Sequence, residues 1–341
     1  MKILKIIPLI VLSLIIFQNC SKDRFADQEI KETVENDTTS IDSLIIDKFF
    51  FSSSETAALF DKLKKEPSLS QITNSGNLPF IGSEGTKAWI YSNNLLDENN
   101  NPVSYPYQIE ILELFSPKDM ILYNVPTVSN GEPLVSGGEF RIRAYKDGKR
   151  LKANPNNNIY IEVPTKTTPD NNMGLFFGTE TNNSVTWTQT DPLVLINPND
   201  SLQGGGDSSR TNFVSINRDS YGVNTNQLNW INCDYFSRNL IGQPKTSITF
   251  ISSDTAKPIE SIVKYIYLPE LNSIMNAYDT ASGEIVIGLE AVVVALAADT
   301  KGTPYFFLSE KFKITAGQQV EINVEKATDE SIKVALDGLG L

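Results

Sequence analysis

Apolar and polar residues alternate with a period of two along much of the chain after residue 81. The clearest runs are 107–111, 140–145 and 159–163. Such alternation is typical of strands that bury one face and expose the other. Turn-forming residues separate the runs, and Asp147 followed by Gly148 is a strong signal for a two-residue hairpin. Many short strands joined by turns predict a mainly all-β protein built from sandwiches.

Two features of the pattern need their own interpretation. The run 285–298 is apolar enough for a buried helix, but its β-branched centre, Val292 to Val294, favours a buried strand. In the first half, the apolar phase shifts after Ile111 to Leu112 and Leu114, which predicts a β-bulge. Further strands are expected at 227–236, 246–251, 261–268, 305–314 and 320–324.

Two short helices are expected, one near the start of the folded part and one at the C-terminus. The first begins with Ser53 or Ser54 as its N-cap and ends before Pro67. The second covers 328–336, which begins with capping residues and is followed by Gly338 as a stop.

Composition divides the chain into regions. Residues 197–212 are mostly Asn, Asp, Ser and Gly, which is typical of a linker or long loop. We therefore expect two β-sandwich-like domains, at 48–196 and 213–341. Residues 20–47 are rich in Asp, Glu, Ser and Thr and have little to bury, so a flexible acidic tether is expected there.

The N-terminus has the pattern of a signal peptide, residues 1–19. Lys2 and Lys5 begin it, and the apolar run 6–17 is too short for the roughly 20 residues that span a membrane. The segment ends before Cys20 and resembles a bacterial lipoprotein signal, in which the thiol of the first mature residue is lipidated. An uncleaved anchor, or a plain secretory signal with an incidental cysteine, is the alternative.

Composition also restricts the chemistry. The formal net charge of −12 argues against nucleic acid as the main partner. The chain has no histidine, which excludes Ser-His-Asp and Cys-His catalysis and histidine-ligated metals. If Cys20 is lipidated, Cys233 is the one remaining cysteine, and a buried strand residue is expected there. No catalytic residue, metal site or cofactor is predicted.

Three stretches resemble exported lipoproteins common in Bacteroidota-type bacteria. They are Gly82–Ile90, Leu134–Phe140 and Asn229–Phe236, and the first two also resemble the β-sandwich module of ankyrins and netrin receptors. That lipoprotein group is largely uncharacterised, so the resemblance implies an outer-membrane location and β-architecture but no reaction. Residues 21–25 resemble a surface-export signal interrupted by two basic residues. We expect the cell surface, with a periplasm-facing position as the alternative.

Two groups of side chains are candidates for binding a partner. Basic residues gather around the predicted hairpin, where an anionic partner would suit them, although a solvated hairpin face is the alternative. Tyr265 and Tyr267 share one strand face, as Trp89 and Tyr91 do. Exposed, such pairs form an aromatic platform; otherwise they pack in a core. The basic residues are Arg141, Arg143, Lys149 and Arg150.

Other patterns carry weaker signals. The Asn- and Asp-rich segments 97–101, 154–158 and 197–200 contain calcium-type oxygens, but these residues are also good turn formers and lack the spacing of a calcium loop. Glu110 and Glu113 have the residue types of a glycosidase pair, yet solvent-facing carboxylates on strands are common.

Together these observations predict a lipid-anchored outer-membrane protein without enzymatic activity. Its expected role is binding, as an accessory or assembly subunit beside an outer-membrane protein partner. A glycan- or nutrient-binding surface lipoprotein is the alternative and requires an exposed aromatic platform. The lipid on Cys20 would hold the protein to the outer membrane.

Overall fold

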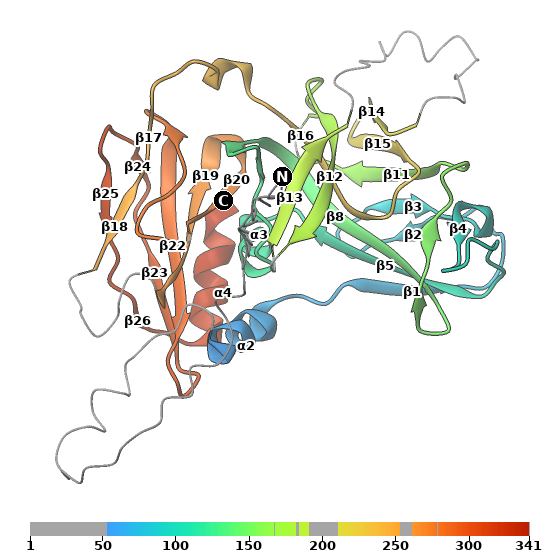
Figure 1. Cartoon of the computed structure of the whole chain (residues 1–341), viewed down its shortest axis with the longest axis horizontal. Coiled ribbons are helices and arrows are strands. Elements are labelled where there is room, and N and C mark those ends of the chain that lie inside the picture. The colour runs from blue at the N-terminus through green and yellow to red at the C-terminus, as the bar shows by residue number, and fades with distance from the viewer. Residues whose placement is uncertain are drawn as a thin grey trace, which may run out of the picture. The chain divides into compact units, whose positions relative to one another are not determined.

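The structure is a computed structural model that describes residues 53–166, 168–181, 184–190, 211–252, 261–277 and 279–340. Strands dominate it, with short helices near its start and at its end, so the prediction of a mainly all-β protein is confirmed (Figure 1). The predicted signal peptide 1–19, the lipidation site Cys20 and the tether 20–47 lie outside the described residues.

Most described strands belong to three sheets. The large sheet contains, in order, β1 (Ser68–Ile72), β5 (Tyr107–Leu114), β8 (Val135–Lys146), β16 (Asn229–Tyr235), β12 (Gly174–Thr181) and β13 (Ser184–Gln189), with β9 (Lys149–Arg150) paired to β8. The outer sheet contains β14 (Phe213–Ile216), β15 (Ser220–Thr225), β11 (Ile159–Pro164), β3 (Lys87–Trp89) and β2 (Phe80–Ile81). The C-terminal sheet contains β20 (Ser273–Ala277), β19 (Val263–Leu268), β22 (Glu290–Ala298), β23 (Pro304–Leu308) and β26 (Glu325–Lys326), with β24 (Phe312–Lys313) paired to β22.

Smaller elements complete the described chain. The two-stranded pairs are β4 (Leu95–Leu96) with β10 (Lys152–Ala153), β6 (Val128–Ser129) with β7 (Glu132–Pro133), β17 (Lys245–Thr246) with β21 (Ile285–Val286), and β18 (Thr249–Ile251) with β25 (Gln319–Glu321). The α-helices are α2 (Ser54–Leu63), α3 (Pro117–Leu122) and α4 (Asp329–Asp337), and the 3-10 turns are η1 (Ser92–Asn94), η3 (Arg238–Leu240), η5 (Pro269–Leu271) and η6 (Gly338–Gly340).

The large and outer sheets form a β-sandwich. Alternate residues of β5, such as Ile109 and Ile111, point into its core, where they meet Ile161 and Val163 of β11 and Ile231 of β16. Turn chemistry sets the connections: Asp147 and Gly148 both have positive φ, at 51° and 75°, and join β8 to β9 as the predicted hairpin.

The other face of the large sheet is also covered. Leu112 and Leu114 of β5 belong to a second core that contains residues of α2, α3, α4 and the C-terminal sheet. The predicted bulge at this phase shift is wrong, because β5 pairs with β8 in unbroken register from Gln108 to Leu114. The shift in the apolar pattern arises because Ile111 points into the sandwich core, whereas Leu112 and Leu114 point into the second core. The register shift in this sheet instead lies in β16, between Asn232 and Asp234.

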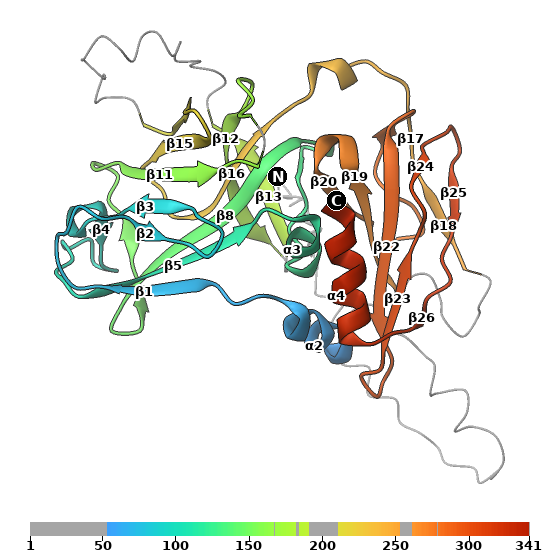
Figure 2. The ribbon, with the colours of Figure 1, turned by 180° about the vertical axis from the view of Figure 1, so that it is seen from behind.

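The C-terminal sheet is likewise buried on both faces. Its central strand β22 sends Val292 and Val294 toward the helices, and Val293 and Ala295 into a third core beside β18 and β25. Figure 2 shows α2, α3 and α4 between this sheet and the large sheet. The strand predicted within 285–298 is therefore confirmed, and its unbroken apolar sequence reflects burial on both sides.

Strand pairing corrects the predicted domain division. The strands β14, β15 and β16, which follow the predicted linker 197–212, pair with strands that precede it. The change to the C-terminal strands therefore comes after Tyr235, and residues 197–210 of the linker lie outside the described part. All described residues fall within one compact unit.

Capping residues explain where the two predicted helices begin. The Ser53 side chain accepts the Thr56 amide at 3.0 Å, and Thr328 accepts the Ser331 amide at 3.1 Å. Both helices are confirmed, and α4 ends at Gly338 as expected. Within the described segments, no helix combines the length and apolar character needed to cross a membrane.

Candidate binding face

The outward face of the outer sheet carries an aromatic pair. Ala88 and Ile161 point into the sandwich core, so their neighbours Trp89 and Tyr160 point away from it. The two aromatic residues are direct cross-strand partners on β3 and β11. Their ring centroids lie 5.3 Å apart with an interplanar angle of 38°, and both side chains are only half-buried. The pair therefore forms a partly exposed aromatic surface on the outer sheet.

Polar side chains converge beside this pair. A Cβ built on Gly222 of β15 would lie 2.5 Å from Ser215 Oγ, 3.0 Å from Tyr160 Oη and 3.3 Å from Asn217 Nδ2. Because glycine has no side chain, these three polar groups can approach one another over β15. Asn217 Nδ2 donates to the Tyr160 phenol at 3.5 Å, and the phenol donates to Glu162 Oε1 at 3.4 Å.

The charges on this face balance each other. Lys87 Nζ and Glu162 Oε2 form an ion pair at 3.2 Å, across the β3–β11 register. Burial raises the pKa of the Tyr160 phenol, and the hydrogen bond from Asn217 offsets this only partly, so the phenol is a neutral donor and acceptor at physiological pH. The aromatic pair is thus surrounded by neutral hydrogen-bonding groups and by one ion pair, whose two charges cancel.

Two arginines of the predicted basic patch form ion pairs with acidic residues of the large sheet. Arg141 pairs with Glu110 at 3.1 Å, and its guanidinium lies 5.1 Å from the Trp230 ring centroid. Arg143 pairs with Glu180 at 2.7 Å. Burial and the charge of Arg143 lower the pKa of Arg141, although an arginine with an acidic partner remains charged. These side chains neutralise one another and offer little free positive charge.

The remaining basic residues lie at the hairpin itself. Lys149 is exposed and pairs with Glu98 at 2.6 Å, while Arg150 is exposed on β9. Exposed pairs of this kind contribute little to stability, because water and salt screen the two charges. The structure therefore pairs the two arginines with acidic residues on the large sheet and leaves Lys149 and Arg150 at the exposed hairpin.

Tyr265 and Tyr267 do not form an aromatic platform, and the alternative, packing in a core, is confirmed. These side chains are 1% and 5% exposed, because their face of β19 packs against the helices. The Tyr265 hydroxyl donates to Asn124 Oδ1 at 3.1 Å, as a buried phenol should. Trp187 and Trp230 are buried too, with their rings edge to face at a centroid distance of 6.4 Å.

The weaker sequence signals have structural roles. The Cys233 thiol is fully buried, and this burial raises its pKa, as expected for an inert core cysteine. The Glu113 carboxylate accepts hydrogen bonds from the amides of Glu84 and Thr86 at 2.7 Å each, so it stabilises a turn. Glu110 forms an ion pair with Arg141. The Asp97 carboxylate accepts the Asn99 and Asn101 amides at 2.8 Å, which supports the turn interpretation.

A buried acidic cluster was missed by sequence reasoning. Glu139 of β8 lies opposite Asn232 of β16, and Asp234 follows beyond the bulge; all three are fully buried. Asn232 Nδ2 donates to Asp234 Oδ2 at 2.5 Å, while both carboxyl oxygens of Glu139 have no hydrogen-bond partner. Two stretches of the lipoprotein resemblance, Leu134–Phe140 and Asn229–Phe236, supply these residues, but only strand pairing reveals that they meet.

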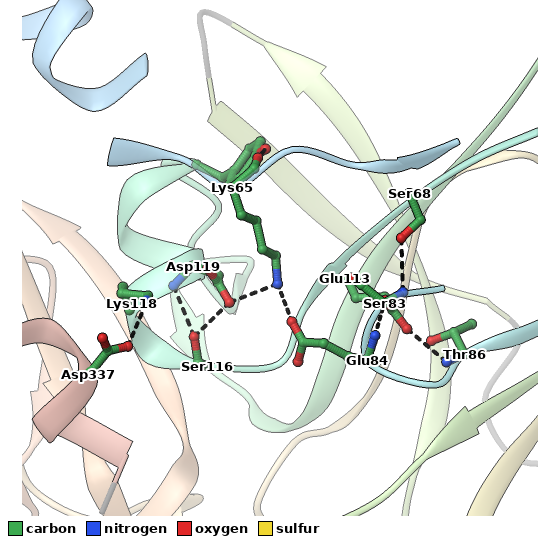
Figure 3. A network of polar contacts seen from close by, with 11 residues as sticks. Lys65, Ser68, Ser83, Glu84, Thr86, Glu113, Ser116, Lys118, Asp119 and Asp337 are labelled. Atoms are coloured by element: carbon green, nitrogen blue, oxygen red, sulfur yellow. Dashed lines mark hydrogen bonds and ion pairs between the residues drawn. The ribbon is translucent and has the colours of Figure 1, made fainter. Parts of the chain in front are cut away.

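A polar network joins the sandwich to the helices (Figure 3). Lys65 Nζ lies between two carboxylates, forming ion pairs with Asp119 of α3, at 2.9 Å, and with Glu84. Ser116 Oγ donates to the same Asp119 oxygen at 2.7 Å. Beside Asp119, in the first turn of α3, Lys118 pairs with Asp337 of α4 at 2.5 Å. These contacts hold α3 against the sandwich and against α4.

Comparison with known proteins adds no relative. The chain matches no model of a known protein family. A search of curated proteins also finds no matching sequence. Within the described residues, no three Cys, Asp or Glu side chains are grouped closely enough to hold a metal ion.

Proposed function

We propose that this protein is a lipid-anchored, non-enzymatic binding subunit of the outer membrane, exposed at the cell surface beside an outer-membrane protein. The lysines, apolar run and Cys20 of the N-terminal sequence support the anchor, since each buried lipid CH₂ contributes about 0.8 kcal/mol. The observation that carries the binding role is an apolar edge of the sandwich, made by Leu69, Leu78 and Ile81.

The apolar edge lies where the two sheets of the sandwich end. Among the described strands, β1 is the last strand of the large sheet and β2 the last of the outer sheet. The Ser83 amide donates to Ser68 Oγ at 2.9 Å, so the two ends adjoin. Leu69 is 58%, Leu78 88% and Ile81 55% exposed.

Such an edge is a suitable contact for another protein. An edge strand has backbone groups that can pair with an added strand, and soluble proteins usually protect it with charges or proline. At this edge, the exposed side chains of Leu69 and Ile81 on the two strands are aliphatic. A protein partner would withdraw these side chains from water, which is the main favourable term in association.

A matched pair of double variants tests the protein contact. The edge variant is Leu69→Lys with Leu78→Ser, and the control is Val334→Lys with Ile241→Ser, which are 61% and 72% exposed away from the edge. Gentle detergent extraction should recover wild type and control with an outer-membrane protein at fixed stoichiometry. The edge variant should be recovered alone. A wild-type protein recovered only as a monomer contradicts the proposed role.

The anchor and its orientation have separate tests. Labelled palmitate should enter the wild-type protein and be absent from the Cys20→Ser variant, because serine offers no thiol for lipidation. Equal labelling of both proteins contradicts the anchor. Protease added to intact cells should digest the protein if it faces outward, while protection until the outer membrane is opened would indicate the periplasmic side.

A further inference from the structure

We propose that the outward face of the outer sheet binds a neutral polysaccharide, with a sugar ring against Trp89 and Tyr160. The aromatic pair lies on β3 and β11 and adjoins the apolar edge, because Ile81 of β2 is the cross-strand partner of Lys87. The inference does not rest on a protein partner. It rests on the aromatic pair, on the polar groups above Gly222 and on the balanced charge of the face.

The aromatic pair provides the apolar contact that a sugar ring needs. One face of a pyranose ring presents mostly C–H groups, which pack against an aromatic face, while the hydroxyls project sideways. Trp89 and Tyr160 lie on adjacent strands at 5.3 Å and are tilted by 38°, so they form a shallow angle instead of a closed stack. Their half-buried state fixes the rings but leaves area for a ligand.

The polar groups beside the pair suit sugar hydroxyls. Tyr160 Oη, Ser215 Oγ and Asn217 Nδ2 approach the same point above Gly222, and they are mixed donors and acceptors. The two hydrogen bonds of the Tyr160 phenol, at 3.4 and 3.5 Å, are at the long limit for such bonds. Ligand hydroxyls at shorter distances would therefore replace weak contacts with stronger ones.

The charge of the face favours a neutral ligand over an anionic one. The ion pair of Lys87 with Glu162 leaves no excess charge beside the aromatic rings. The whole chain carries a formal charge of −12, which repels polyanions at long range. Uncharged polysaccharides remain as the class whose chemistry matches both the rings and the surrounding groups.

Affinity electrophoresis tests the inference with named probes. The protein is run through gels containing a soluble β-1,3-glucan, an α-1,4-glucan or a galactomannan, with dextran sulfate as the charged probe. At least one neutral polymer should retard the wild type. Trp89→Ala and Tyr160→Ala should each weaken retardation about tenfold, the loss of one stacking contact. The control Tyr145→Ala removes a half-buried tyrosine from the large sheet and should leave retardation unchanged.

Fluorescence gives a second measurement on the unaltered chain. Trp187 and Trp230 are buried, so acrylamide should quench mainly Trp89, and the bound polysaccharide should protect that residue. If the aromatic variants fail to fold, Asn217→Ala decides the matter: weaker retardation supports the site, and unchanged retardation overturns it.

Several outcomes would overturn the inference. They are wild-type retardation by none of the neutral polymers, retardation by dextran sulfate alone, or equal retardation of wild type and Trp89→Ala. A Trp89→Ala variant that loses its protein partner, with no glucan binding in the wild type, would assign the face to protein contact.

Discussion

At the scale of single residues, two carboxyl groups on neighbouring strands are withdrawn completely from water. Burial, together with the nearby charge of Asp234, raises the pKa of Glu139 well above its usual range. Burial likewise raises the pKa of Asp234, although Ser136, the Gly137 amide and Asn232 act against it. The pair therefore retains a proton at pH values where exposed carboxyl groups have lost theirs.

This arrangement makes stability depend on pH in a defined direction. An unfolded carboxyl group titrates at about pH 4, whereas the folded groups titrate higher, so the folded state binds more protons above that pH. Their stabilising contribution is complete below about pH 4 and is lost as pH rises toward the folded pKa values. The sign is opposite to that of an acid held in a salt bridge.

The variant Glu139→Gln tests this direction. It removes the charge but keeps the shape, so relative to wild type it should become increasingly stable as the pH is raised from 4.5 to 8. Urea unfolding at several pH values measures the difference, with Glu330→Gln, an exposed α4 residue, as the control. A difference between Glu139→Gln and wild type that does not change with pH would contradict a retained proton.

At the scale of elements, the helices are held by specific caps and by the core between the sheets. Thr56 of α2 accepts the Ala298 amide of β22 at 3.1 Å through its side chain, so the helix is hydrogen-bonded to the C-terminal sheet. Ile332 and Leu336 of α4 are one turn apart and fully buried in the same core. The opposite side of α4 includes Val334, which is exposed.

A pair of substitutions in α4 tests this packing. Ile332→Ala should reduce the free energy of unfolding by about 2–5 kcal/mol, the range for removing a buried aliphatic side chain. Val334→Ala, on the exposed side, should change it by at most about 0.5 kcal/mol. Urea denaturation followed by circular dichroism measures both, and equal effects would show that α4 is not anchored as described.

The strands and caps could be predicted from the sequence because their causes are local. Alternation, β-branched residues, the turn at Asp147 and the cap at Ser53 all act within a few residues. The change of apolar phase at Leu112 does not reveal its cause, because a strand buried on both faces and a strand with an inserted residue give the same sequence pattern. Pattern alone records that a side chain is apolar, not which core it enters.

At the scale of the whole molecule, one core contains residues from both ends of the described chain. Leu59 of α2, Trp187 and Trp230 of the large sheet, Val294 of β22 and Ile332 of α4 belong to the same cluster. Opening either group of strands would expose this shared apolar surface to water. Its burial therefore couples the sandwich to the C-terminal sheet.

We expect this coupling to produce a single cooperative unfolding transition. In urea, the tryptophan fluorescence and the circular dichroism signal should change at the same midpoint. Ile332→Ala should lower the midpoint reported by tryptophan, although the described C-terminal strands and α4 contain no tryptophan. Two separate transitions, or a tryptophan midpoint unchanged by that variant, would show independent halves.

The molecular arrangement and the binding face were the least predictable parts. Composition identified 197–212 as a linker, but strands on either side of it pair with each other, a long-range contact that local composition does not record. Period-two spacing placed Tyr265 and Tyr267 on one face without showing that helices cover it. The spacing of Trp89 and Tyr91 can be read from the sequence, but the pairing of Trp89 with Tyr160 depends on the β3–β11 register.

The buried thiol of Cys233 can report how often the core of the sandwich opens. The thiol is enclosed in the core between the large and outer sheets, and the sequence has only one other cysteine, Cys20. A small maleimide can react with Cys233 only while that core is open, so its labelling rate measures how often the native protein opens there. We expect slow labelling in buffer, immediate labelling in concentrated urea, and rates that follow the unfolding free energy across the Ile332 and Glu139 variants. Rapid labelling of the native protein would mean that the sandwich opens far more easily than the rest of the fold.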